Sequence, residues 1–381
     1  MFDSSLGKVI STSGPRGLSS GALSLIFCLV GLFFLTAYQI LVPLGLDEVN
    51  PITSGFHDDR NYVSNDAVIK RLDDYYFINN GYWYISYVAM LLMPSNWVFL
   101  LKLINLIFLS LTYHTTLKLA EKLASVKIYC GLFYLFIPTL AVVSKEWFSI
   151  FLCIKLVDVY TASKTSIYRF ALLVIFGFLL LCTKYVYFFI MIALMLLSRG
   201  LYSKTRILGY GIAASLFLAL IFNYLPLFAD ELIILRFIEM SSEGANYGIN
   251  SVAGTLSDRF SGSTFYSFFQ FFVLPIPAKF NALYNYFFPL MPFFMCSIGY
   301  ICINFRDIFK RFTALFVIFF SYSFLVILIN FGANYRYKLL PIMLAFILIS
   351  VHGEGSRSFR IYILFSFIFL MSYFIMGYFR F

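Results

Sequence analysis

An acidic pair follows the first apolar segment of the chain, in the run Gly-Phe-His57-Asp58-Asp59-Arg60. Adjacent carboxylates can hold a divalent cation, or one can accept the proton of an acceptor hydroxyl while the other orients it. We therefore take Asp58 and Asp59 as candidate catalytic residues, flanked by His57 and Arg60 as candidate substrate contacts. A solvated loop that caps a helix is the alternative. The sequence fixes no cofactor, but Mg²⁺ or Mn²⁺ is the ion that this pair would bind.

Two short turns between apolar segments carry further charges: Lys145 and Glu146 in one, Lys184 in the next. A charge close to the hydrocarbon of a bilayer is costly unless it meets water, a partner or a ligand. Lys145 is a candidate phosphate ligand, and the alternative is a local ion pair with Glu146. Lys184 is a candidate of the same kind, and the alternative is a side chain that extends to the water interface.

A late segment, Tyr335-Arg336-Tyr-Lys338, also lies at the predicted outer end of a helix. The rigid guanidinium of Arg336 suits phosphate oxygens, while Tyr335 and Lys338 add a ring and a second cation. Arg236 and Arg259, in the second long loop, are further candidates for binding an anionic substrate. Charge pairing within that loop is the alternative for both.

Other polar residues are interpreted as structural. Lys155 and Asp158 stand three residues apart on one predicted helix and can neutralise each other. His114 and His352 lie near predicted cytoplasmic helix ends and have no companion nearby in the sequence.

Composition excludes a water-soluble globular protein. Of the 381 residues, 61% are hydrophobic and only 12% are charged, and the mean hydropathy is +0.87. The formal charge of +10 comes from basic residues in short loops between apolar segments, which is a topology signal and not a sign of nucleic-acid binding. The lipid bilayer is therefore the expected surrounding.

The elements that position these residues are long apolar segments. A helix needs roughly 20 apolar residues to cross a bilayer, and many segments here meet that length. We predict an all-α integral membrane protein, a single polytopic domain over residues 1–381, with its N terminus in the cytoplasm. About eleven transmembrane helices are predicted at roughly 21–45, 96–118, 128–143, 147–163, 168–183, 185–198, 205–227, 283–304, 312–331, 339–351 and 361–379.

Two predicted outer segments, about 46–95 and about 228–282, are too long for simple turns. Asp66–Tyr76 and Trp83–Met93 in the first are expected to form helices at the membrane interface. Residues 168–198 are predicted as two helices joined at Thr183 and Lys184, although one tilted helix is an alternative. The cytoplasmic loops are short and basic, so we expect the chemistry on the outer face.

The pattern resembles the glycosyltransferase C superfamily, membrane enzymes that take sugars from polyprenyl phosphate or pyrophosphate carriers. The resemblance is carried by His57 to Arg60 followed by Asn80-Gly81-Tyr82, by the turn from Pro138 to Glu146, and by Arg336 to Pro341. The chain also looks like bacterial O-antigen and capsule repeat-unit polymerases, which share its size and aromatic richness.

The resemblance implies that Asp58 or Asp59 activates an acceptor hydroxyl or binds a metal, and that Arg336, Lys145 and Lys184 neutralise the departing phosphate. It implies an undecaprenyl-linked donor and a glycan acceptor at the periplasmic face of a bacterial inner membrane, beside other polysaccharide-assembly proteins. A repeat-unit polymerase is the preferred function. The alternatives are a single-sugar transferase, a lipid-linked glycan flippase or transporter, and a non-catalytic scaffold.

Overall fold

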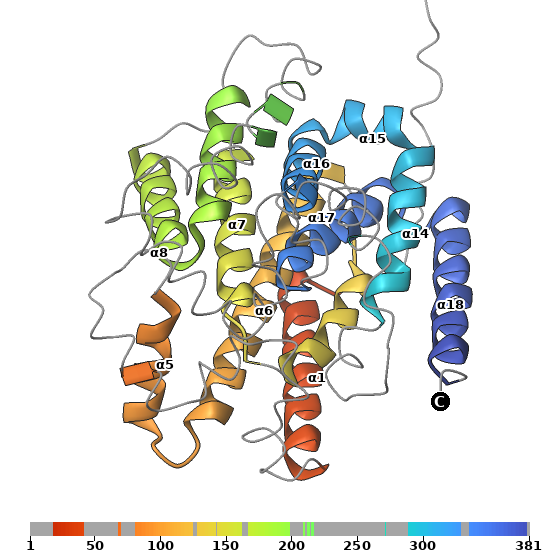
Figure 1. The fold of residues 1–381 in the computed structure, drawn as a ribbon. Coiled ribbons are helices and arrows are strands. Elements are labelled where there is room, and N and C mark those ends of the chain that lie inside the picture. The colour runs from red at the N-terminus through yellow and green to blue at the C-terminus, as the bar shows by residue number, and fades with distance from the viewer. Residues whose placement is uncertain are drawn as a thin grey trace, which may run out of the picture.

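The protein is all helical in the part that the structure, a computed structural model, describes. That part contains eleven helical elements and no strand (Figure 1). It comprises residues 18–41, 68–69, 81–124, 128–141, 143–161, 167–198, 209, 212–213, 215–216, 271, 289–328 and 335–378.

The observed helices follow the predicted segments closely, except that most of the helix predicted at 205–227 lies outside the described residues. Most of the interfacial helix predicted at Asp66–Tyr76 also lies outside them. The short α5 begins before the helix predicted at Trp83–Met93, and α15 was not predicted. The helices are α1 (Ser20–Leu41), α5 (Gly81–Leu92), α6 (Trp97–Ala124), the 3₁₀ helix η1 (Gly131–Ala141), α7 (Glu146–Thr161), α8 (Ile167–Ser198), α14 (Leu290–Ile303), α15 (Phe305–Arg311), α16 (Thr313–Leu328), α17 (Tyr335–Gly353) and α18 (Arg357–Tyr378).

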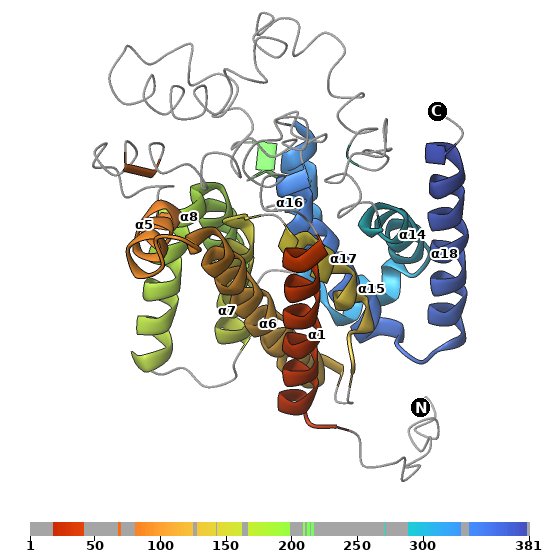
Figure 2. The ribbon, with the colours of Figure 1, turned by 90° about the horizontal axis from the view of Figure 1, so that it is seen from below.

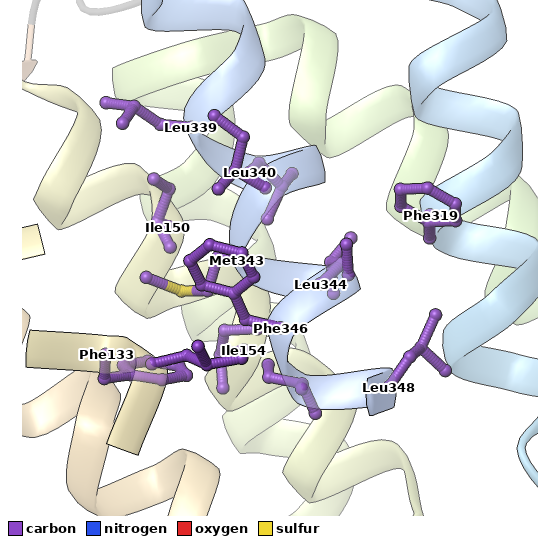
Figure 3. Close-up of a cluster of buried hydrophobic side chains, with 14 of the residues drawn as sticks. Phe133, Ile150, Ile154, Phe319, Leu339, Leu340, Met343, Leu344, Phe346 and Leu348 are labelled. Carbon is purple, nitrogen blue, oxygen red and sulfur yellow. The ribbon is translucent and has the colours of Figure 1, made fainter. Parts of the chain in front are cut away.

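Helix α17 forms the centre of the bundle. It packs against α16, α14, α6, η1 and α7, and every residue from Ile342 to Ile349 is fully buried. Figure 3 shows its side chains directed to several neighbours, with Leu339 and Leu340 near Ile150 of α7. A helix that is apolar on all sides is stable only when other elements enclose it. The apolar run of α17 therefore determines where its neighbours pack.

The outer helices carry apolar stripes on their exposed sides. Figures 1 and 2 both place α18 at one edge beside α14, and α8 with α5 at the opposite edge. Exposed residues recur at helical spacing, so each stripe lies along one face. They are Leu25, Leu29 and Phe33 on α1, Phe170, Val174 and Phe178 on α8, and Ile361, Leu364, Phe365, Ile368, Met371 and Ile375 on α18.

Exposed apolar faces of this extent are typical of a surface that contacts lipid. Two described helices are long and apolar enough to cross a membrane, over residues 20–39 and 97–123. A third span results only if α15 and α16, which are bent by 116°, count as one. The prediction of about eleven membrane-spanning helices is not confirmed, because apolar helices such as η1, with 11 residues, and α14, with 14, fall short of about 20.

Helix α8 is a hairpin of two halves. Lys184 interrupts it with φ −157° and ψ 84°. A Cβ on Gly177 would lie 3.4 Å from the Phe188 ring, which is too close for residues eleven positions apart on a straight helix with a rise of about 1.5 Å per residue. The turn predicted at Thr183 and Lys184 is thus present, and the single tilted helix is excluded.

Polar contacts at one end of the bundle connect residues far apart in the sequence. Asp158 pairs with Lys122 of α6 as well as with Lys155, which lies 3.4 Å away. The interpretation of Asp158 as structural is therefore supported. His352 was expected to be isolated, but two other helices supply partners for its ring. The hydroxyl of Tyr300 lies 2.9 Å from Nδ1, and Oδ2 of Asp307 lies 2.9 Å from Nε2.

Glu354 connects this end of α17 to the beginning of η1. Its Oε2 accepts the backbone N–H groups of Tyr129 and Cys130 at 3.0 and 3.1 Å. Burial raises the pKa of Glu354 above its ordinary value, and these backbone donors oppose the rise. The carboxylate therefore accepts hydrogen bonds from backbone N–H groups that have no carbonyl partner within a helix.

We expect Glu354→Ala to lower the free energy of unfolding by about 1–2 kcal/mol, because the N–H groups of the buried Cys130 and the more exposed Tyr129 lose their acceptor. Glu354→Gln keeps an acceptor oxygen and should cost less. Because the folded pKa is raised, the wild type should lose stability as the pH rises from the usual glutamate pKa to the raised one, and both variants should lack this dependence. Thermal unfolding in detergent at several acidic pH values measures both effects. Equal stability of the two variants would contradict the role of the acceptor.

The orientation of the bundle can be tested with a native cysteine. Cys302 is exposed near the end of α14, whereas Cys130, Cys153 and Cys182 are buried. We expect a membrane-impermeant maleimide to label the protein in inside-out vesicles and not in right-side-out vesicles. Cys302→Ser is the control that should remove the signal. Labelling confined to right-side-out vesicles would reverse the predicted orientation.

Candidate functional site

The candidate site begins at the first residue of α7. Glu146 is fully buried there, and its backbone N–H donates to Ser144 Oγ at 3.2 Å. A carboxylate in the first turn of a helix is favoured by the partial positive charge of the helix terminus. The local sequence therefore both starts α7 and accommodates an acidic side chain inside the apolar bundle.

The carboxylate of Glu146 contacts residues from the α8 hairpin. Its Oε2 forms an ion pair with Lys184 and accepts the hydroxyl of Tyr187 at 3.1 Å. The ammonium of Lys184 also lies 4.5 Å from the centre of the Tyr187 ring. Among the described residues, none bonds to the other oxygen, Oε1. Lys184 therefore does not extend to the interface, and it is the ion-pair partner of Glu146 across 38 residues of sequence.

Further lysines are buried toward the same end of the bundle. Lys338, in the first turn of α17, is completely buried, with its ammonium 5.9 Å from the Phe271 ring. Lys102 of α6 is 3% exposed and lies 4.8 Å from the Tyr38 ring. Lys145 is also buried. A buried ammonium group in an apolar setting is favoured when an anion is bound near it.

The first outer loop reaches this site through α5. A Cβ on Gly81 would lie 3.2 Å from Thr183 Cγ2 and 3.3 Å from the carbonyl oxygen of Cys182, so the close approach to the hairpin tip favours glycine. Tyr82 donates its hydroxyl to Asn105 Oδ1 at 2.9 Å. The Gly81-Tyr82 segment, which the resemblance singled out, is thereby fixed beside Lys184.

The structure brings together Glu146 and Lys184, and it places the buried Lys145 and Lys338 toward the same end. The backbone of Tyr335 and Arg336 begins α17, but their side chains lie outside the described part. The candidates that lie wholly outside it are His57, Asp58, Asp59, Arg60, Arg236 and Arg259.

Sequence analysis did not identify Tyr187, Asn105 or Lys102 as part of the site. Tyr187 follows Lys184 by three residues, but whether it faces Glu146 depends on the fold of the hairpin. Lys102 and Asn105 are polar residues within the apolar α6, separated by three positions. That helical spacing is the signal that could have identified them.

The described residues contain no group of three or more His, Cys, Asp or Glu side chains that could hold a metal. Glu146 is a poor metal ligand in this setting, because the ammonium of Lys184 opposes a second cation at the same carboxylate. A divalent ion at Asp58 and Asp59 stays a prediction.

No protein-family model, curated protein or solved structure matches the chain.

A double-mutant cycle separates a structural role of the ion pair from a role in activity. Lys184→Met and Glu146→Gln should each lower the free energy of unfolding strongly, by about 3–5 kcal/mol where an uncompensated charge remains. The double variant should recover much of that loss, because no charge is left unpaired. Lys155→Met, at the half-exposed pair with Asp158, is a matched control that should cost less than about 1 kcal/mol.

The cycle is read by thermal unfolding in detergent together with the glycan assembly in cells that the resemblance predicts. A double variant that regains both stability and assembly would mean that the pair is only structural. A double variant that is stable and inactive would assign Lys184 or Glu146 to the activity.

Proposed function

We propose that this chain is an integral membrane glycosyltransferase that takes a sugar from a polyprenyl phosphate or pyrophosphate carrier. The single observation that carries the proposal is the burial of Lys145, Lys184 and Lys338 with Glu146 toward one end of an apolar helical bundle. Ammonium groups are costly at such a place, and they are favoured where an anionic group is bound. The proposal places this end of the bundle near the headgroup region of the bilayer, where the phosphate groups of lipids lie.

The lysines suit the chemistry of the departing group. When an acceptor hydroxyl attacks the anomeric carbon, the bond from that carbon to the phosphate oxygen breaks and the oxygen leaves with the electron pair. The negative charge that develops there is stabilised by cations already in place. In the proposal, Lys145, Lys184, Lys338 and Arg336 supply this stabilisation, and Asp58 or Asp59 accepts the proton of the hydroxyl.

The finer parts of the proposal follow from the resemblance to membrane glycosyltransferases. The donor is undecaprenyl-linked, the acceptor is a glycan of the cell surface, and the preferred subtype is an O-antigen or capsule repeat-unit polymerase. A bundle of about eleven spans in a bacterial inner membrane would present the site to the periplasm, where other polysaccharide-assembly proteins act. A single-sugar transferase is the alternative with the same site.

A flippase or transporter for lipid-linked glycans is the rival from another class. Such proteins place charges along a path through the membrane and use helices broken near its centre. Here Glu146 and Lys338 stand in the first turns of α7 and α17. The break at Lys184 is the tip of a hairpin. This location of the charges at helix ends favours the enzyme.

Glycan chain length in cells that lack the protein tests the proposal. Complementation with Asp58→Asn/Asp59→Asn or with Lys338→Met should lose the polymer ladder and leave a single capped repeat, because the base or the phosphate contact is missing. Lys122→Met, whose pair lies at the opposite end, should restore the ladder. Each variant must be present in membranes at the wild-type level.

Loss of even the single repeat would favour a single-sugar transferase or a flippase. An unchanged ladder in both site variants would contradict the proposal. Glycan transfer by the purified protein in detergent then separates the two enzyme subtypes from a flippase, since a flippase forms no product where no membrane divides the sample.

A further inference from the structure

The ion pair of Glu146 and Lys184 is incompletely satisfied. Lys184 holds only Oε2 of the carboxylate, together with the hydroxyl of Tyr187, and Oε1 has no bond within the described residues. Both side chains are almost fully buried, at 0% and 5% exposure. A buried carboxylate that uses one oxygen is a weaker counter-ion than one that uses both. This pair is therefore suited to exchange for a stronger anion.

The position of Lys184 favours such an exchange. It is the residue of α8 whose backbone leaves the helical conformation, and it lies at the tip of the hairpin beside Gly81 of the first outer loop. Its ammonium has the Tyr187 ring as a second contact that remains when an anion changes. Glu146, for its part, would keep the hydroxyl of Tyr187 and the favourable first turn of α7.

We infer that Glu146 is a built-in counter-ion of Lys184, which the phosphate or pyrophosphate group of a lipid-linked ligand displaces. The inference rests on the proposed function, and it states which group pairs with Lys184 when no ligand is bound. The carboxylate pairs with the Lys184 ammonium inside the apolar bundle, and it competes with the ligand for Lys184. A diphosphate, with more charge and more acceptor oxygens, replaces it more readily than a singly charged anion.

Removal of the competing charge should strengthen ligand binding. With purified full-length protein in detergent and farnesyl pyrophosphate as the probe, we expect Glu146→Gln to bind about tenfold tighter than the wild type or more. Lys184→Met should bind at least about tenfold more weakly. Asp158→Asn, which breaks the ion pair at the opposite end, should bind like the wild type. Calorimetry gives the three dissociation constants.

Inorganic pyrophosphate, as a second probe, distinguishes recognition of the anion alone from recognition that needs the lipid. A gain in Glu146→Gln with either probe supports the inference, and equal or weaker binding of both overturns it. If Glu146→Gln does not fold, Glu146→Asp is the second variant, whose shorter side chain should weaken the pair and give a smaller gain. No gain in that variant also overturns the inference.

The two proposals can fail separately. If the wild type binds neither probe, the proposed function and the inference both fail. If the wild type binds farnesyl pyrophosphate and the Glu146 variants show no gain, the anion site stands and only the role of Glu146 as a competing counter-ion falls.

Discussion

The cost of burying charge among apolar helices is the constraint on which this structure depends. Glu146 and Lys184 offset that cost for each other, and they do so from different elements, the first turn of α7 and the tip of the α8 hairpin. Their pairing requires the tip to dock beside α7, which brings Tyr187 to the same carboxylate and Gly81 to the same tip. A local electrostatic requirement thus fixes the arrangement of three segments at the site.

The enclosed helix α17 supplies the second half of the arrangement. Its middle, from Ile342 to Ile349, has no exposed side, so its position is fixed by packing and not by a polar face turned to solvent. Lys338 begins this helix and is fully buried with it. Packing of the apolar part of α17 therefore buries Lys338, although a charged side chain is costly to bury. The ammonium of Lys338 contacts the Phe271 ring.

The sequence predicts local features of this fold well, because span length, flanking charge and turn residues act over short distances. It predicts the helices that became α6, α7, α16 and α17, and the reversal at Lys184. It does not predict partners. Adjacency suggests Lys145 as the partner of Glu146, yet Lys184 takes that place because the hairpin docks there. His352 has no neighbouring partner in the sequence for the same reason, since Tyr300 and Asp307 come from other helices.

The 3₁₀ helix η1 connects the two ends of the bundle. Glu354 holds the chain at Tyr129 and Cys130, while α7 must begin with Glu146 toward the opposite end. The 11 residues of η1 extend roughly 22 Å at about 2.0 Å each in a 3₁₀ helix, against about 16 Å in an α-helix. The tighter winding reaches farther, and Pro138 within it has no N–H to satisfy. Through η1, the anchor at Glu354 is thus connected to the turn that carries Glu146 toward the opposite end of the bundle.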